Sequence, residues 1–243
     1  MHTTLKASKR ARSAQKGPIL RMAEMIGQSL LHFEEVVERT VAEFTESTAA
    51  DSRVLGVSSG EIGNTSHFKR HRYCSLELST ARNGRSQRRP HVIGDPATLP
   101  FPEKRFDACV NLLTLEHVCE PGLVLRELVR TLKPGGGLLL VVQQESEINQ
   151  APHDYYRFTR FGVEYLLESA GFTEIIIKPV GGLFRLLSRR LFDGLEFIPV
   201  IVFPLAALLL APLALALPLL DFLDRDNRFT LGYICTARRP LTT

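Results

Sequence analysis

Cysteine is scarce in this sequence, and its spacing excludes the common zinc sites. The four cysteines form no C-x-x-C pair and no His-linked ligand pattern. Two of them fall in apparent strands, where a buried thiol is an ordinary packing residue. We therefore expect no metal, a reducing, cytoplasmic compartment, and four free thiols at Cys74, Cys109, Cys119 and Cys235.

Acidic residues are absent from the first 21 positions, which hold six basic residues. The whole chain has 30 basic and 26 acidic residues, so this segment carries the excess charge and the rest is near neutral. Residues 1–17 are expected to form a flexible basic arm, either a solvated tail or a contact to an anionic membrane or nucleic acid. The arm lacks the apolar segment of a secretory signal.

A length of 243 residues suits one α/β domain with appendages rather than two full domains. Apolar side chains at spacings of three and four predict an N-terminal helix within residues 18–50. The domain itself is expected to comprise residues 51–182 and 228–243. Residues 183–227 would then form an apolar insertion that associates with a membrane or a partner.

The middle of the chain has the element order that builds a parallel sheet. Residues 106–113 are a short apolar run of the kind that forms a buried strand. Residues 121–132 carry apolar side chains at helical spacing, and Pro134 with three glycines ends that helix before an apolar run at 137–142. This order predicts a βαβ unit, whose functional loops lie at the carboxyl ends of the strands.

Three short motifs in this region carry a family resemblance: D-x-x-x-L-P-F at 95–101, L-E-H-V at 115–118 and L-K-P-G-G at 132–136. Together they resemble the class I S-adenosylmethionine-dependent methyltransferases, in particular the small bacterial methyltransferase type 11-like family. The resemblance implies an α/β, Rossmann-like, seven-stranded and mostly parallel sheet of order 3-2-1-4-5-7-6, flanked by helices. It also implies S-adenosylmethionine as the cofactor.

The glycine-rich turn after the first strand departs from the family pattern acid-x-G-x-G-x-G. Gly56 stands in place of the acid and Ser58 in place of the first glycine. Gly60 is retained, whereas Ile62 replaces the third glycine. The family's acid helps to hold the amino group of the cofactor, so its absence favours weaker binding or lost activity, unless Glu61 substitutes for it.

Two acids follow the next strands and are candidate cofactor ligands. Glu77 ends the strand at 72–79, where an acid about 20 residues beyond the glycine turn accepts the ribose hydroxyls; the alternative is a solvated surface glutamate. By resemblance, Asp95 reaches the adenine amino group, and the backbone at Pro96 and Ala97 flanks the ring. The alternative for Asp95 is a turn in which its side chain bonds the local backbone.

Polar side chains after the fourth and fifth strands are candidates for the acceptor side of the site. Glu116 and His117 start the segment after strand four; His117 is a candidate base, and the alternative is electrostatics at a helix start. His153 is a second candidate base, from the loop after strand five.

The same loop continues as Asp154, Tyr155, Tyr156 and Arg157, which we expect to contact the substrate. Related methyltransferase-like proteins carry a similar H-D-Y-Y-R-F-T run. The alternative is that Asp154 and Arg157 pair to brace the turn. Thr159 is expected to cap the helix that follows, and Gly171 to end it.

The insertion contains an uncharged run of 24 residues, Phe197–Leu220. A straight helix of this length would cross a bilayer, but a single crossing would separate the last strand from its own sheet. Pro199, Pro204, Pro212 and Pro218 are expected to break such a helix into short pieces or a re-entrant hairpin. Residues 184–192 mix arginines with apolar side chains, as an interfacial helix on anionic lipid does. A homodimer interface and a flap over the active site are the alternatives.

These features favour a methyltransferase that transfers the methyl group to an oxygen or nitrogen of a membrane-associated acceptor, peripheral on the inner face of the membrane. A second possibility is a catalytically inactive, methyltransferase-like binding or scaffold protein at a membrane. A third, an RNA methyltransferase, depends on the arginines of residues 81–91 and on the basic arm. That loop lacks the interleaved aromatic residues that stack on bases, which disfavours nucleic acid.

Overall fold

The computed structural model describes residues 33–58, 65–78, 91–195, 197–199 and 201–241. The chain divides into two compact units. One unit, here called the body, comprises Val37–Lys178 and Gly232–Thr243; the other, here called the hairpin unit, comprises Met1–Val36 and Pro179–Leu231. The expected arm at 1–17 and the first part of the expected N-terminal helix lie outside the described residues.

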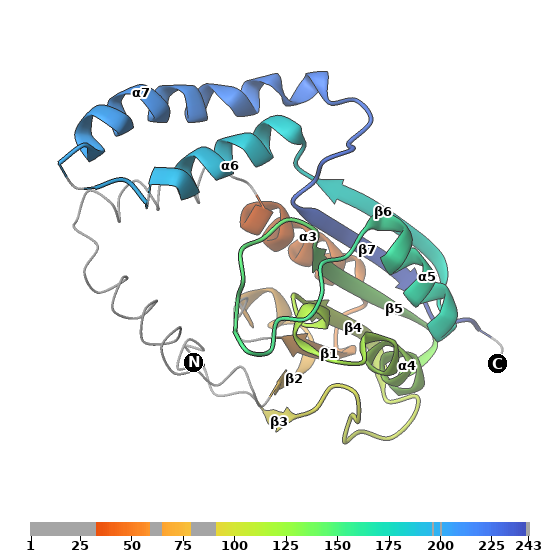
Figure 1. The fold of residues 1–243 in the computed structure, drawn as a ribbon. Helices are drawn as coiled ribbons and strands as arrows, with labels where there is room; N and C mark the ends of the chain where they lie inside the picture. Colours follow the sequence, from red (N-terminus) through yellow and green to blue (C-terminus); the bar gives the residue numbers. More distant parts are fainter. Residues whose placement is uncertain (1–32, 59–64, 79–90, 196, 200, 242–243) are drawn as a thin grey trace. The chain divides into compact units, whose positions relative to one another are not determined.

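A seven-stranded sheet of order β3-β2-β1-β4-β5-β7-β6 organises the fold, which confirms the predicted topology (Figure 1). β1 to β5 pair in parallel, and β7 pairs with β5 in the antiparallel sense. The strands are β1 (Arg53–Ser58), β2 (Arg72–Leu78), β3 (Val92–Gly94), β4 (Phe106–Leu112), β5 (Leu132–Gln143), β6 (Thr173–Val180) and β7 (Gly232–Arg238).

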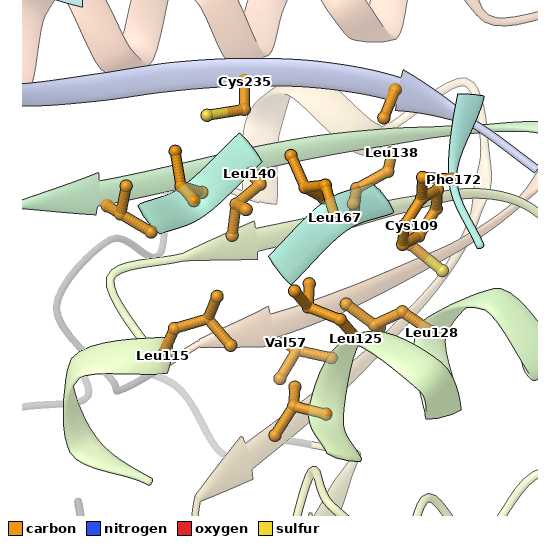
Figure 2. Packing of buried hydrophobic residues seen from close by; sticks show 14 of the residues in the cluster. Val57, Cys109, Leu115, Leu125, Leu128, Leu138, Leu140, Leu167, Phe172 and Cys235 are labelled. Carbon is orange, nitrogen blue, oxygen red and sulfur yellow. The ribbon is translucent and has the colours of Figure 1, made fainter. Parts of the chain in front are cut away.

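Helices α4 (Pro121–Thr131) and α5 (Arg160–Ala170) bury their apolar stripes against one face of this sheet. Figure 2 shows the resulting core, in which Leu125 and Leu128 of α4 and Leu167 of α5 gather over Leu138 and Leu140 of β5. All five side chains are at most 1% exposed. Burial of this kind, at about 25 cal/mol per Å² of apolar surface, is the main stabilising term of such a domain.

The opposite face of the sheet meets α3 (Phe33–Ser47), the described part of the predicted N-terminal helix. Val37 and Val41 are buried, and the ring of Phe44 lies 3.5 Å from the place that a Cβ on Gly137 would take. The Phe44 ring therefore packs over Gly137 on this face of β5. The two single-turn elements η1 (Thr65–Phe68) and η3 (Leu115–His117) complete the body.

Several local predictions are confirmed in the body. Thr159 Oγ1 accepts a hydrogen bond from the Gly162 N–H at 3.1 Å, and Gly171 ends α5 with φ of 97°. All four cysteines are free, and burial raises the pKa of the Cys235 thiol to about 12. One boundary differs: β5 begins at Leu132, before the glycines that we expected to form a turn.

The hairpin unit contains α6 (Leu183–Leu195), α7 (Phe203–Ala216) and η4 (Leu217–Leu223). Our expectation that each proline would break the insertion is wrong for Pro212, which lies inside α7. Pro204 and Pro218 stand in the first turns of α7 and η4, where a missing N–H breaks no helical hydrogen bond. Of the described residues, one helical stretch, Phe203–Leu223, is long and apolar enough to cross a membrane by length and composition.

Candidate functional site

The carboxyl edge of the sheet brings two predicted cofactor residues together. Ser58 at the end of β1 stands beside Glu77 of β2, and Glu77 stands beside Ile93 of β3. On its other side Ser58 pairs with Leu112 of β4. Gly60 lies outside the described residues. The parallel register thus places Ser58 and Glu77 in one row where the loops of this fold bind ligands.

Glu77 is buried, with only 5% of its surface exposed. The alternative that it is a solvated surface glutamate is therefore wrong. A buried carboxylate needs partners that compensate for its lost hydration, and Glu77 has an interaction within the chain. Its position at a strand end is where a ligand hydroxyl would find an acceptor.

Asp95 forms the local turn that we had considered as its alternative. Its Oδ1 accepts a hydrogen bond from the Ala97 N–H at 2.8 Å, and its carbonyl accepts one from the Thr98 N–H at 3.1 Å. Pro96 between them is buried, and the Asp95 side chain is exposed. The turn thus holds the carboxylate and the backbone of Pro96 and Ala97 in a fixed arrangement at the end of β3.

A tyrosine fills the space beside Gly56, a contact that the sequence reasoning missed. A Cβ at Gly56 would collide with the hydroxyl oxygen of Tyr73 and lie 2.6 Å from its Cζ. The Tyr73 ring stacks on Phe68 with centroids 4.2 Å apart. Burial raises the pKa of the Tyr73 hydroxyl to about 12, so it stays neutral. An acid at position 56 has no room here, and the large residue on the adjoining strand was the only signal of this in the sequence.

His117 has a fixed tautomer. Its Nδ1 lies 2.8 Å from the carbonyl oxygen of His153, and a carbonyl oxygen only accepts hydrogen bonds. Nδ1 therefore carries the proton, and Nε2 keeps the lone pair that a base needs. Oδ1 of Asp154 lies 3.9 Å from the same Nδ1.

Glu116 connects η3 to two other segments of the edge. Its Oε1 accepts a hydrogen bond from the Gln143 N–H at 2.6 Å, and its carbonyl oxygen accepts one from the Tyr155 N–H at 2.8 Å. Its Oε2 is buried and has no hydrogen-bond partner among the described residues. Burial raises the pKa of the Glu116 carboxyl to about 7. This bracing role was not foreseen from the sequence.

Asp154 and Arg157 pair with each other, as the bracing alternative anticipated. Both carboxylate oxygens accept from the guanidinium, at 2.6 and 2.8 Å, and the Asn149 N–H donates to Oδ2 at 2.7 Å. Burial alone would raise the pKa of Asp154, but these hydrogen bonds outweigh it and lower that pKa. Arg157 also donates to the Glu147 carbonyl at 2.8 Å. The pair therefore closes the loop on itself.

The aromatic members of the loop remain open to solvent. Tyr155 is 44% and Tyr156 39% exposed. The Tyr156 hydroxyl donates to the Cys119 carbonyl at 2.8 Å, and Nδ1 of His153 lies 3.0 Å from the Tyr155 hydroxyl. Phe158 is buried, and its N–H bonds the Gln143 carbonyl at 2.9 Å. The loop thus presents two tyrosines and a histidine on a braced backbone.

The described part of the chain contains no group of three or more His, Cys, Asp or Glu that could hold a metal ion. The arginine loop at 81–91 lies almost entirely outside the described residues, as does the basic arm. The RNA-binding alternative that depends on them is therefore not addressed by the described geometry.

Comparison with known proteins identifies the domain. The model of a methyltransferase domain family matches residues 55–140. The demethylmenaquinone methyltransferase of Paenarthrobacter aurescens is 37% identical over 70 residues, which cover 28% of this chain and 27% of that protein. The fatty-acid O-methyltransferase of Mycolicibacterium smegmatis is 31% identical over 118 residues, covering 42% of this chain and 43% of that protein. The chain thus matches less than half the length of these relatives.

The fold is also similar to that of a solved methyltransferase. Phosphoethanolamine N-methyltransferase 2 of Haemonchus contortus, in complex with S-adenosyl-L-methionine, superposes with a TM-score of 0.54 at 15% identity. The superposition covers 83% of this chain and 51% of that one. Residues 55–140 are therefore similar to a methyltransferase domain family, and the sheet that contains them has the fold of the class I S-adenosylmethionine-dependent methyltransferases.

Proposed function

We propose that this protein is an S-adenosylmethionine-dependent methyltransferase. The observation that carries the proposal is the buried carboxylate of Glu77 beside Ser58, at the carboxyl edge of a sheet whose residues match a methyltransferase domain. Ser58, Gly60 and Glu77 would hold the cofactor together with the turn at Asp95 to Ala97. The cofactor supplies a methyl group on a sulfonium, which an oxygen or nitrogen nucleophile can displace.

His117 is the proposed base of the reaction. Its Nε2 would accept the proton that the acceptor loses, and the carbonyl of His153 would keep the ring oriented through Nδ1. The carboxylate of Asp154 at 3.9 Å would stabilise the imidazolium that results. Catalysis by this arrangement is mostly a matter of positioning, with the proton transfer as a further contribution.

His153, Tyr155 and Tyr156 are the proposed acceptor contacts. Two of these residues expose aromatic surface, while the buried Asp154–Arg157 pair braces the loop behind them. Asp154 and Arg157 would therefore act by holding the loop rather than by touching the acceptor. Tyrosine faces near a sulfonium also attract its positive charge.

The acceptor is proposed to be a membrane-associated molecule at the inner face of a cytoplasmic membrane. The two sequence relatives are named for a demethylmenaquinone and a fatty acid, both apolar molecules. Four free thiols fit a reducing compartment. The apolar helices of the hairpin unit supply a surface for such a location.

Calorimetric titration with S-adenosylmethionine tests the cofactor site. We expect micromolar binding that Glu77→Gln weakens at least about tenfold, the loss of one charge-assisted hydrogen bond. Asp95→Asn keeps an oxygen that accepts from the Ala97 N–H, so it preserves the turn and removes only the charge. Weaker binding by this variant would therefore indicate a cofactor contact at Asp95 rather than a role in the turn. Glu168→Gln on the exposed side of α5 is the matched control. The absence of binding by folded wild-type protein would contradict the proposal.

Transfer of a labelled methyl group to lipid extracts tests the chemistry. His117→Gln should reduce turnover by about 100-fold without changing the affinity for S-adenosylmethionine, since a base contributes about 10²–10⁴-fold. Equal turnover in wild type and His117→Gln would show that another group accepts the proton.

A second candidate function is a methyltransferase-like binding or scaffold module without activity. The observation that favours it is Tyr73, which fills the space where the family's acid would stand. This candidate predicts that the cofactor does not bind, or that it binds and no acceptor is methylated. The titration and the transfer assay therefore separate it from the enzyme.

A further inference from the structure

The two helices of the hairpin unit form an antiparallel pair whose ends meet (Figure 1). At the end opposite the turn, here called the closed end, α6 begins and η4 ends. There the Arg185 guanidinium bonds Oδ2 of Asp221 at 2.6 Å, and the Leu183 N–H donates to Asp224 at 2.8 Å. Along the pair, Ser188 Oγ donates to the Ala214 carbonyl at 2.6 Å. The chain thus enters and leaves the pair at the same end, so the two helices form a hairpin.

The helical stretch α7–η4 turns apolar side chains outward along its whole length. Only Phe203 and Ala214 of α7 are buried, and the Ala214 carbonyl accepts the hydrogen bond from Ser188 of α6. Seven outward side chains are each more than half exposed: Leu205, Leu208, Leu209, Leu213, Leu219, Phe222 and Leu223. At the turn between the helices, Ile201 is 95% exposed. An apolar surface of this extent requires a partner.

The chemistry of this surface fits hydrocarbon better than protein. Residues 197–220 contain no charged side chain, and the outward face of α7 offers leucine, proline and alanine. Protein interfaces combine an apolar centre with a polar rim and about ten hydrogen bonds, for which this face has no side-chain groups. A lipid interior demands none.

The charges of the unit indicate how it meets the lipid. Residues 183–227 contain four arginines and five acids, so the hairpin itself is not basic and has no net attraction to anionic lipid. Arg189 and Arg190 lie in the middle of α6, and insertion end-on would carry them into the hydrocarbon. If the pair lies flat, α7 faces the lipid while α6 stays on the water side.

We propose that α7–η4 lies in the plane of the bilayer surface and inserts its outward face among the acyl chains. Binding then depends on apolar burial, so it occurs on neutral lipid and resists salt. Any preference for anionic lipid comes from outside the hairpin. The inference is independent of methyl transfer, since it depends only on the geometry of the hairpin unit.

The absence of tryptophan from the chain permits a direct test. Single tryptophans are placed at Leu205, near the turn, at Leu213, and at Phe222, near the closed end. On vesicles of phosphatidylcholine, the fluorescence emission of all three tryptophans should shift to the blue. Brominated acyl chains should quench the three alike, which would place each tryptophan at a depth of about 5–10 Å. Phe161→Trp in α5, where the native side chain is 78% exposed, is the control that should stay unchanged.

Flotation on vesicles measures the binding itself. Leu208→Asp with Leu219→Asp should lower partitioning onto phosphatidylcholine at least about tenfold, because each buried leucine contributes a factor of this order. Phe161→Asp should leave it unchanged, since an acid in the first turn of α5 suits the helix dipole. Raised salt should not release the wild type from phosphatidylcholine.

Three outcomes would overturn the proposal. Binding only to vesicles that contain phosphatidylglycerol, and only at low salt, would assign the contact to basic segments. A blue shift without vesicles, with a dimer in sedimentation that the aspartates dissociate, would assign the face to a second copy of the chain. Quenching at Leu205→Trp but not at Phe222→Trp would show end-on insertion.

Discussion

Helices α4 and α7 are both rich in leucine, yet they stand in opposite relations to water. In α4, Val124, Leu125 and Leu128 are fully buried, and arginines occupy other sides of the helix. In α7, most leucines are exposed, and no side of the helix is polar. The number of apolar residues therefore does not decide burial. The spacing of the apolar residues decides burial, because a helix packs through an apolar face only when its other faces are polar.

A second contrast separates the buried polar groups of the body from the outward face of α7 in the hairpin unit. In the body, the polar side chains of Glu116 and Asp154 are held by specific hydrogen bonds. Removing one of these atoms should therefore lower the stability of the fold. In the hairpin unit, the outward side chains of α7 are exposed, so truncating one of them should change the stability of the fold little. Paired substitutions, one in each region, test this difference.

The largest expected difference is between two leucine truncations. Leu125→Ala should lower the free energy of unfolding by about 3 kcal/mol, because it leaves a cavity in a packed core. Leu208→Ala should change it by less than about 0.5 kcal/mol, since its side chain is 70% exposed. Urea denaturation of both variants measures the difference. Equal losses would mean that α7 packs as α4 does.

The second difference concerns two glycines. Gly56→Asp should cost about 2 kcal/mol, because the new side chain collides with Tyr73. Gly194→Asp in α6, where a Cβ meets nothing within 4 Å, should be nearly neutral. Thermal unfolding checks both. Adding Tyr73→Ala to Gly56→Asp should cost less than the sum of the single changes, and simple additivity would refute the clash.

The third difference concerns two aspartates paired with arginine. Asp154→Asn should cost about 1.5 kcal/mol at neutral pH, because it weakens a buried, charge-assisted contact. The pKa of Asp154 is lowered in the folded state, so its contribution is complete above the unfolded pKa and is lost as the pH falls through the folded pKa. The cost should therefore disappear in acid. Asp226→Asn, in an exposed pair, should have no measurable effect at any pH.

The smallest expected effect belongs to Glu116. Its pKa is raised to about 7 by burial, so the folded state binds a proton that the unfolded state has already lost between about pH 4.5 and 7. The wild type should lose stability as the pH rises through that window. Glu116→Gln should therefore be more stable than the wild type at pH 8, and similar to it at pH 4.5. Melting curves at both values decide this, and a constant difference would exclude the titration.

Much of the fold was predictable because it depends on local pattern. The apolar run at 106–113 and the helical period at 121–132 each specify one element, and the order of elements then leaves few topologies. The cap at Thr159 and the left-handed end at Gly171 depend on residues within one turn of each other. The start of β5 at Leu132 was missed, because Leu132 pairs with Phe106 of β4 ahead of the glycines.

The candidate site was predictable only as a set of residues. Glu77 and Asp95 were predicted as cofactor residues from the sequence, but the sequence does not show whether a carboxylate is buried or solvated. It also proposed Asp154 and Arg157 for the substrate, whereas their side chains bind each other. Contacts such as that of Glu116 with Gln143 join residues far apart in the chain. No local pattern encodes them.

Three features follow from the sequence alone, since each is a property of neighbouring residues: the order of strands and helices, the motifs that resemble methyltransferases, and the lack of charge in residues 197–220. Only the tertiary structure decided that Tyr73 occupies the space beside Gly56, that His117 keeps its lone pair on Nε2, and that α7 turns its leucines outward. These depend on which distant atoms meet, and packing fixes that only when the whole chain has folded.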